Sequence, residues 1–343
     1  MAASSRLRTW QFIPYLQAEG IEVRNCSFFD ESYLKATYKE KPKLQHILRA
    51  YVRRFRDLKY LAWANIVIVE KEVFPYLPGW FEKRFVKLNV KYIVDYDDAI
   101  FHSYDLNKNL IIRKVFGKKL DSLIRSAACV SVGNTYLQNY CISHGAKKTQ
   151  YFPTVVDIGR YSCLRASEDG EYRIGWIGSP STTKYLWLVR DALIELSKKL
   201  SVRLVVIGAG RLEGYGIPLE QHEWSEDTEV ELLNSIHVGI MPLLDSPWEN
   251  GKCGYKLIQY MACCKPVVGS PVGINKDIIQ PEVGCKASNS SEWYEALESI
   301  GENESLRQKM GEAGRKLVEE KYTAQLMANR WKELLLEAVN DEK

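Results

Sequence analysis

Short apolar runs alternate along the chain with longer stretches in which apolar residues recur at a helical period. This alternation is typical of α/β proteins with parallel sheets. It predicts strands at Ile21–Cys26, Ile66–Val69, Tyr92–Val94, Cys129–Val132, Tyr172–Ile177, Arg203–Ile207, His237–Met241 and Pro266–Gly269. It predicts helices at Lys43–Leu61, Ile111–Ser126, Thr182–Leu200, Tyr255–Cys263 and Ala324–Val339.

The rhythm of strands and helices stops once, in the Pro-containing segment TQYFPTVVDIGRYS and the polar ASEDGE that follows it. We therefore place a domain boundary near Val156–Glu171. The pattern predicts a first domain at 1–157, a second at 158–322, and a C-terminal helix at 323–343. Two Rossmann-like, doubly wound units in one chain predict a ligand cleft between the carboxyl ends of their strands.

Length and composition agree with two globular domains. The chain has 343 residues, of which 46% are hydrophobic and 26% charged. It has no apolar run of the ~18 residues that a membrane span needs, and the N-terminus lacks the apolar core of a signal peptide. The eight cysteines show no framework spacing, and the adjacent Cys263 and Cys264 suit buried thiols in a reducing compartment. We expect a cytoplasmic protein.

Charge is unevenly distributed between the two halves. Residues 1–150 hold 25 Lys and Arg against 14 Asp and Glu, a net charge of +11, and residues 151–343 carry −7. Within the first half, Lys43–Leu61 combines an apolar stripe with a strongly cationic face that includes Arg49, Arg53 and Arg56. Such a helix can lie on an anionic membrane surface. Alternatively, its stripe packs on the core and its basic face is simply solvated.

Two small-residue turns are candidate phosphate sites. In YRIGWIGSPSTTKYL a strand runs through a turn into a helix, whose N-cap would be Ser181 or Thr182. Backbone amides at such a turn can bind phosphate, although any helix start needs similar residues. In WENGKCGYKLIQYMA a Gly-rich turn opens a helix with Lys252 and Lys256 on one face, where the helix dipole alone disfavours them. The candidate ligands are Gly178, Ser179, Ser181, Thr182, Lys184, Gly208, Lys252, Gly254, Lys256 and Gln259.

The second turn and the sequence after it resemble the signature of family four retaining glycosyltransferases (glycosyl transferases group 1). Relatives read close to E-A-M-A and G-x-P-V-V where this chain has Gln259-Tyr260-Met261-Ala262 and Cys264–Val268. VVIGAG, IHVGIMPL and FPTVVD resemble further family segments. The resemblance implies a GT-B fold and a nucleotide-diphosphate sugar as donor, held by the second domain without a metal. It implies a hexosyltransferase-type enzyme acting on a sugar or lipid-linked acceptor, in cell-surface polysaccharide or glycolipid assembly.

Three departures from the family pattern stand out. The two signature carboxylates, which contact the donor sugar and the ribose, are replaced by Gly251 and Gln259, with Glu249 two residues before the first. The Arg and Lys usually found near the first turn of the second domain are absent, so Lys252 and Lys256 would supply that charge. The chain also opens directly with a helix pattern, so that either the N-terminus is truncated or the first sheet lacks a strand.

An acidic cluster, VDYDDAIF, marks the first domain. Asp95, Asp97 and Asp98 follow a predicted strand, where a carboxylate can act as a base or a group of three can hold a divalent cation. An Asp-rich helix cap is the structural alternative. The resemblance places the acceptor at this strand end and needs no metal there, so we predict Asp97 and Asp98, with Glu249 in the second domain, as catalytic residues. The five histidines show no ligand spacing for zinc.

Together these patterns predict a retaining glycosyltransferase. The missing carboxylates leave open a non-catalytic sugar-nucleotide-binding protein. A nicotinamide-dependent dehydrogenase is disfavoured because no GxGxxG motif follows a strand. No nucleic-acid-binding module is visible.

Overall fold

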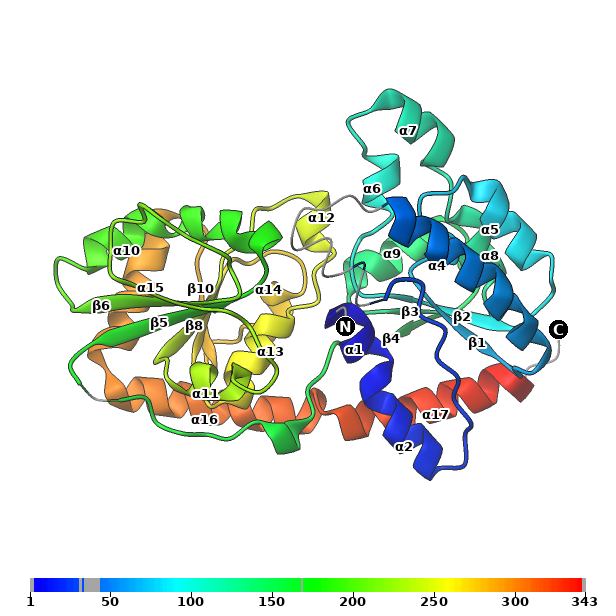
Figure 1. Cartoon of the computed structure of the whole chain (residues 1–343). Helices are drawn as coiled ribbons and strands as arrows, with labels where there is room; N and C mark the ends of the chain where they lie inside the picture. The colour runs from blue at the N-terminus through cyan, green and yellow to red at the C-terminus, as the bar shows by residue number, and fades with distance from the viewer. Residues whose placement is uncertain (1–2, 31–32, 34–43, 168, 341–343) are drawn as a thin grey trace. The chain divides into compact units, whose positions relative to one another are not determined.

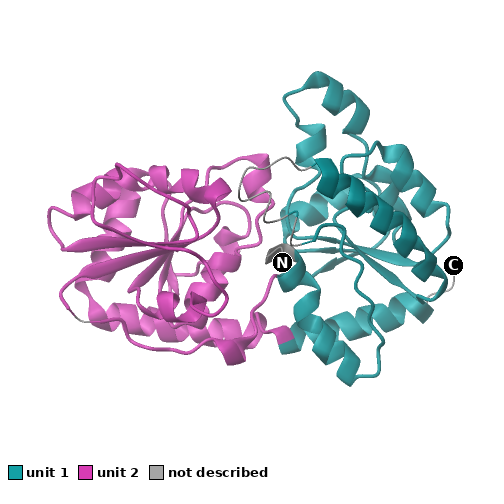
Figure 2. Ribbon diagram, in the orientation of Figure 1, with its two compact units in different colours: residues 1–152, 325–343 teal, residues 153–324 magenta. Residues whose placement is uncertain are grey.

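The computed structural model describes residues 3–30, 33, 44–167 and 169–340. It divides into two compact units (Figure 2). Unit 1 comprises residues 1–152 and 325–343, and unit 2 comprises residues 153–324. The sequence pattern placed the corresponding boundaries at 157 and 322.

Unit 1 is built on a four-stranded parallel sheet. Its strands are β1 (Val67–Glu70), β2 (Tyr92–Tyr96), β3 (Cys129–Val132) and β4 (Thr149–Tyr151), in the order β1-β2-β3-β4. Helices cover both faces, with α5, α8 and α9 on one side and α2 and α17 on the other (Figure 1). Three of these strands were predicted from sequence. The fourth was missed because it is only three residues long and polar.

The predicted strand at Ile21–Cys26 is wrong, because this segment has no regular structure. Every residue of β2 and β3 is buried, as expected for strands inside a parallel sheet. In Ile21–Cys26, by contrast, exposed polar residues alternate with half-buried ones, and a segment of that kind cannot replace a strand buried on both faces. Within the described residues, the sheet of unit 1 therefore begins at β1.

The helices of unit 1 are mostly short. The predicted helix Ile111–Ser126 is two helices, because the chain turns after Phe116 at Gly117. The predicted helix Lys43–Leu61 forms from Leu44 onward, and Lys43 lies outside the described residues. The helices are α1 (Ala3–Arg8), η1 (Trp10–Phe12), α2 (Ile13–Ala18), α4 (Leu44–Asp57), η2 (Leu58–Ala62), α5 (Gly79–Val86), α6 (His102–Asp105), α7 (Leu110–Phe116), α8 (Asp121–Ser126), α9 (Thr135–Ser143) and α17 (Ala324–Asn340).

Unit 2 is built on a six-stranded sheet in which every recorded strand pair is parallel. The strand order is β10-β9-β8-β5-β6-β7, which reverses direction between β5 and β8. This reversal defines a doubly wound sheet. The strands are β5 (Tyr172–Ile177), β6 (Val202–Ile207), β7 (Leu219–His222), β8 (Val238–Met241), β9 (Val267–Gly269) and β10 (Gly284–Lys286), of which β7 and β10 were not predicted.

Helices lie on both faces of this sheet (Figure 1). The predicted helix Thr182–Leu200 is wrong in type, because a 3₁₀ segment precedes a short α-helix. Trp176, Leu193, Val206, Ile240 and Leu297 contribute to the core between sheet and helices. The helices are η3 (Ile158–Arg160), η4 (Pro180–Leu188), α10 (Arg190–Leu196), α11 (Glu229–Asn234), α12 (Pro247–Asn250), α13 (Tyr255–Ala262), α14 (Asn275–Ile278), α15 (Ser290–Glu302) and α16 (Glu304–Lys321). Among the described helices, none is both long enough and apolar enough to cross a membrane.

One disulfide joins Cys163 to Cys264, with 5.2 Å between the two Cα atoms. The prediction that Cys263 and Cys264 are both buried thiols is therefore wrong for Cys264, which is disulfide-bonded. Cys264 follows α13 with a left-handed φ of 57°, so its side chain turns away from that of its neighbour Cys263. Cys263 points into the core as a free thiol, and burial raises its pKa to about 12.

Candidate functional site

The reversal of strand order in unit 2 marks where a doubly wound sheet usually binds its ligand, beyond the carboxyl ends of the strands. Gly178 directly follows β5, and Gly208 directly follows β6. The segment that leads to α12 and α13 follows β8. The donor residues predicted from sequence therefore lie on these loops and on the helices η4 and α13 that follow them, at one edge of one sheet.

The turn after β5 is capped by Ser179, and the predicted N-cap at Ser181 or Thr182 is wrong. Ser179 has an extended backbone, and Pro180 occupies the first helical position, which its fixed φ favours. Thr182 completes a capping box by accepting a hydrogen bond from the Ser179 backbone N–H at 3.1 Å. Ser181 instead contacts Ser179 through its hydroxyl, at 2.9 Å.

Gly178 packs against both an aromatic ring and an ammonium group. A Cβ at this position would lie 2.4 Å from the Trp176 ring and 2.7 Å from Lys256 Nζ, so only glycine fits. Gly208 packs just behind it, because a Cβ there would lie 2.4 Å from the Gly178 carbonyl oxygen. The backbone at the end of β5 thus runs directly beside the Lys256 ammonium.

The Lys256 ammonium lies over an aromatic face and has no acidic partner. Its Nζ is 4.1 Å from the centroid of the Trp176 ring, a cation–π distance. Among the described residues, no hydrogen bond or ion pair joins Lys256 to the protein. Burial, together with the positive charge of Lys252, lowers the pKa of Lys256 to about 7. An anion bound here would oppose that shift, because a negative charge nearby favours the protonated lysine.

The start of α13 presents two further features of an anion site. Gly254 is its N-cap and has a left-handed φ of 68°, and a Cβ there would lie 2.4 Å from Ile278 Cδ1. The backbone N–H groups of the first turn of this helix point toward its N-terminus, as in any α-helix. Lys252 precedes the turn, with its Nζ 5.5 Å from the Trp248 ring centroid. Lys184 on η4 lies close enough to Glu249 to help lower the pKa of that carboxyl.

Glu249 is buried in unit 2, and its carboxylate already has partners. Tyr185 and Ser246 each donate a hydroxyl hydrogen bond to it, one to either carboxylate oxygen. Burial would raise the pKa of Glu249, but these two hydrogen bonds hold it below its ordinary value. Glu249 on α12 is therefore connected to Tyr185 on η4, and this contact stabilises the position of α12.

Gln259 is also buried, and it belongs to a chain of hydrogen bonds that the sequence did not predict. Its Nε2 lies 3.4 Å from the Tyr161 hydroxyl, which donates to Glu229 Oε1 at 2.7 Å. Trp224 Nε1 donates to the other oxygen of Glu229 at 2.6 Å. A buried carboxylate thus lies one side chain away from the position where the signature carboxylate is missing.

In unit 1 the first aspartate of the acidic cluster is structural. The sequence placed Asp95 after the strand, but it lies within β2 and is almost fully buried. Arg8 of α1 binds it through two hydrogen bonds, of 2.9 Å to Oδ2 and 2.6 Å to Oδ1. Ser131 on β3 donates a third. This bidentate pair fixes the N-terminal helix to the sheet.

The other two aspartates follow β2 and lie near a lysine. Lys71, at the end of β1, forms an ion pair with Asp97 at 3.0 Å. Burial alone would lower the pKa of Lys71, but the charges of Asp97 and Asp98 raise it above its ordinary value. Lys71 has a left-handed φ of 64°, a strained conformation for a residue with a side chain. The structure thus separates the cluster, with Asp95 turned inward and Asp97 turned to Lys71.

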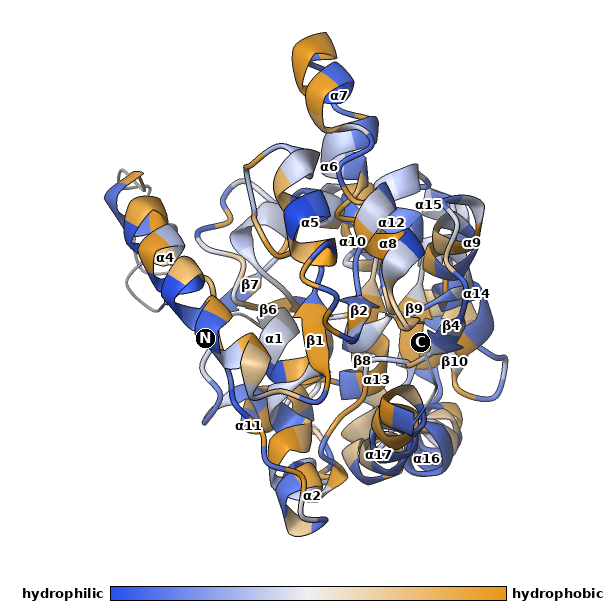
Figure 3. Ribbon diagram, turned by 90° about the vertical axis from the view of Figure 1, so that its right-hand side faces the viewer, coloured by the Kyte–Doolittle hydropathy of each residue, from blue (hydrophilic) through white to orange (hydrophobic). Residues whose placement is uncertain are grey.

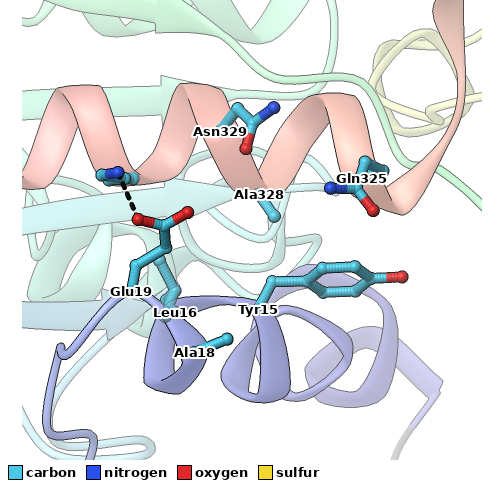
Figure 4. A pocket seen from close by; sticks show the side chains of 8 residues that line it. Tyr15, Leu16, Ala18, Glu19, Gln325, Ala328 and Asn329 are labelled. Carbon is cyan, nitrogen blue, oxygen red and sulfur yellow. Dashed lines mark hydrogen bonds and ion pairs between the residues drawn. The ribbon is translucent and has the colours of Figure 1, made fainter.

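The described residues contain no group of three His, Cys, Asp or Glu side chains arranged to hold a metal ion. They do contain a cavity of about 90 Å³ between α2 and α17 in unit 1 (Figure 4). An ion pair between Glu19 and Lys332 lies at its edge. Small-molecule pockets start at roughly 300 Å³, and this cavity contains none of the predicted site residues. It is not the candidate site.

Comparison with known proteins shows which proteins have a similar sequence or fold. Residues 171–303 match the family model described as Glycosyl transferases group 1. The structure is similar to a glycosyltransferase from Rickettsia africae ESF-5, with 13% identity over 100% of this chain and 97% of that one and a TM-score of 0.69. Sucrose-phosphate synthase from Thermosynechococcus elongatus shares 15% identity over 86% and 79% of the two chains, with a TM-score of 0.66. No curated protein sequence matches.

The chain is a glycosyltransferase with a GT-B fold. The matched residues of this glycosyltransferase include every predicted donor contact from Gly178 to Gln259, together with Glu249. Asp97 and Asp98 lie outside the match. A third similar structure, Anabaena HepE in complex with UDP, has 15% identity over 82% of this chain and 81% of its own, with a TM-score of 0.61.

Sequence reasoning missed several side chains of the glycosyltransferase that now matter. Trp176 was read only as part of a strand, although a tryptophan two residues before the turn can reach a lysine on α13. Tyr161 and Glu229 are far from Gln259 in sequence, and no local pattern connects them. Lys71 lies two residues after a predicted strand and Asp97 just after the next strand, so their approach could have been expected from the parallel order.

Proposed function

We propose that this glycosyltransferase moves a sugar from a nucleoside-diphosphate donor to an acceptor hydroxyl, with retention at the anomeric carbon. The observation that carries the proposal is Lys256, a cation without an acidic partner beside Gly178 and the start of α13. A diphosphate is the anion that would suit two lysines and a helix N-terminus together. The solved structures of Anabaena HepE with UDP and with UDP-glucose support this choice of ligand.

In the proposed reaction, charge develops on the diphosphate as the bond to the sugar breaks. Lys256, Lys252 and backbone amides at Gly178–Thr182 stabilise that charge, so the donor side requires no metal. Lys184 adds positive charge at the same edge. Gln259 contacts the ribose through its amide, and Tyr161 holds it in place. Glu249, held in place by Tyr185 and Ser246, contacts the donor sugar.

On the acceptor side, Asp97 or Asp98 orients the acceptor hydroxyl or accepts its proton. Lys71 pairs with Asp97 and holds its carboxylate in place, and an ionised carboxylate is the form that can act as a base. We propose hexosyl transfer onto a sugar or lipid-linked acceptor, within polysaccharide or glycolipid assembly.

A membrane location is part of the proposal, and helix α4 supports it. Its apolar residues Leu48 and Val52 stay exposed, so the helix does not bury its whole stripe against unit 1. Arg49 and Arg56 are exposed on the same helix. Arg53, in contrast, pairs with Asp30 at 3.1 Å and donates to a backbone carbonyl, so it has an internal role. An anionic bilayer would match the exposed groups.

We propose the cytoplasmic face of the membrane as the site of action. The Cys163–Cys264 disulfide argues in the other direction, because disulfides are rare in reducing compartments. Alkylation of free thiols in intact cells, followed by mass spectrometry, tests this point. Labelled Cys163 and Cys264 agree with a reducing compartment, and a persistent disulfide places the protein outside it.

A second candidate function is sugar-nucleotide binding without transfer. It is favoured by Gly251 and Gln259, which stand where relatives carry carboxylates. Calorimetric titration with a panel of nucleoside diphosphates and their sugars, followed by a transfer assay with the sugar that binds, separates the two. Binding with transfer or donor hydrolysis above background supports the enzyme. Binding without either supports the alternative, and no binding by any nucleotide overturns both.

A further inference from the structure

Helix α7 projects from unit 1, and much of its ribbon consists of hydrophobic residues (Figures 1 and 3). Leu110, Ile111 and Val115 are 66%, 72% and 50% exposed, and Leu106 before the helix is 51% exposed. None of the seven residues of α7 is buried. The helix is nevertheless well formed at its start, because Asn109 Oδ1 accepts a hydrogen bond from the Ile111 backbone N–H at 2.9 Å.

The segment of sequence that carries this apolar surface is basic. From residue 106 to residue 120 the sequence has no Asp or Glu. Lys108, Arg113, Lys114 and Lys118 flank the exposed aliphatic side chains. Lys114 stands three residues after Ile111, a spacing that places both side chains on one side of an α-helix, and Lys118 follows the end of the helix. Their long stems can lie along apolar surface while the ammonium groups reach outward.

An unsupported helix of this length is marginally stable in water. Exposed aliphatic residues gathered on one projecting element usually mark an interaction surface. The basic residues Lys108, Arg113, Lys114 and Lys118 indicate the chemistry of the partner. It must have an anionic surface above an apolar interior. An anionic phospholipid bilayer has both properties in layers.

We propose that α7 inserts Leu110, Ile111 and Val115 into the boundary between the headgroups and acyl chains of an anionic bilayer. Lys108, Arg113, Lys114 and Lys118 then contact the lipid phosphates. This inference rests on the proposed membrane location and deepens it by naming the segment that enters the bilayer. Helix α4, which also exposes the aliphatic side chains of Leu48 and Val52, would add a second contact with the bilayer.

The test compares the full chain with Leu110→Asp/Ile111→Asp, a double variant on α7. The matched control is Leu326→Asp/Leu336→Asp, which places the same two charges at exposed leucines (39% and 48%) on α17. Flotation uses vesicles of 70% phosphatidylcholine and 30% phosphatidylglycerol, and of phosphatidylcholine alone, at low and high salt. A monolayer of the anionic mixture reports penetration as a rise in surface pressure. Circular dichroism checks that both variants keep the native helix content.

We expect the α7 double variant to bind anionic vesicles at least tenfold more weakly and to lose the rise in surface pressure. The control should stay within about twofold of the unaltered chain, since its positions are remote from the proposed surface. If the chain binds vesicles but the α7 variant binds and penetrates equally well, the inference is overturned while the membrane location stands. If the chain binds no vesicle, both fail. Loss of a dimer in the α7 variant would assign the helix to self-association and also overturn the inference.

Discussion

The charged side chains at the carboxyl edges of the two sheets differ in whether they form ion pairs. In unit 1, charged side chains at the strand ends find acidic or basic partners within the unit, as Arg8 does with Asp95 and Lys71 with Asp97. In unit 2, Lys256 at the equivalent edge faces an aromatic ring, and its pKa falls to about 7. Internal pairs stabilise the fold. An unpaired cation reduces stability and leaves its charge for a ligand.

Removing one member of the buried pair in unit 1 should have the largest effect. Asp95→Ala leaves the Arg8 guanidinium buried and uncompensated, which we expect to lower the free energy of unfolding by about 3–5 kcal/mol. Urea denaturation followed by circular dichroism measures it. The control is Asp191→Ala, because Asp191 is largely exposed and pairs only weakly with Arg190. A loss at Asp95 no larger than at Asp191 would remove the contrast between the units.

In unit 2, removing the charge of Lys256 should weaken nucleoside-diphosphate binding without lowering the free energy of unfolding. Lys256→Met keeps the apolar stem over Trp176 and removes the charge. We expect nucleoside-diphosphate affinity to fall by about 1.5–3 kcal/mol, the contribution of a charge-assisted hydrogen bond. Lys309→Met, at an exposed position on α16, serves as the control for loss of one positive charge. Unchanged affinity in calorimetry would mean that Lys256 does not contact the diphosphate.

Asp97 tests whether a paired carboxylate in unit 1 also takes part in the reaction. Asp97→Asn keeps the shape and removes the charge that Lys71 faces. We expect transfer to fall at least tenfold while donor affinity changes less than twofold, because the loss concerns the transition state. If EDTA abolishes activity and Mg²⁺ restores it, the acidic cluster holds a metal and the base assignment is wrong.

The sequence predicted the elements that have strong, continuous patterns. β3 and β5 have the predicted bounds, because strands inside a parallel sheet are predominantly apolar and buried. Short edge strands such as β4 and β10 were missed, since three residues carry too little pattern. Ile21–Cys26 was assigned as a strand because it was taken as a short apolar run, but nothing in so short a pattern distinguishes a strand from an extended surface segment.

In the candidate site, too, residues with a distinctive local pattern could be predicted, whereas their long-range contacts could not. Lys252, Lys256 and Gln259 could be found because a helix start with two lysines is locally unusual. Glu249 could be found but not its hydrogen bonds to Tyr185 and Ser246, which determine its task. Contacts of this kind join residues that are distant in the chain, and no single local period records them.

The smallest predicted effect is a pH dependence that arises at Lys256. Its folded-state pKa of about 7 lies below its ordinary value of 10.5, so the unfolded chain binds more protons between these values. Stability should therefore rise as pH increases from 7 to 10.5, and this slope should be shallower in Lys256→Met. The affinity for a nucleoside diphosphate should change in the opposite direction, because the anion selects the protonated lysine.

With a pKa of about 7, the protonated fraction falls about fivefold between pH 7 and pH 8, and nucleoside-diphosphate affinity should fall by the same factor. Binding at pH 8 should then take up close to one proton, which calorimetry detects as a difference between buffers of unequal ionisation enthalpy. Lys256→Met should take up none, while Lys309→Met should behave as the unaltered chain does. Equal proton uptake in all three proteins would assign the titration to the nucleotide or to another side chain. The unpaired cation would then no longer distinguish unit 2 from unit 1.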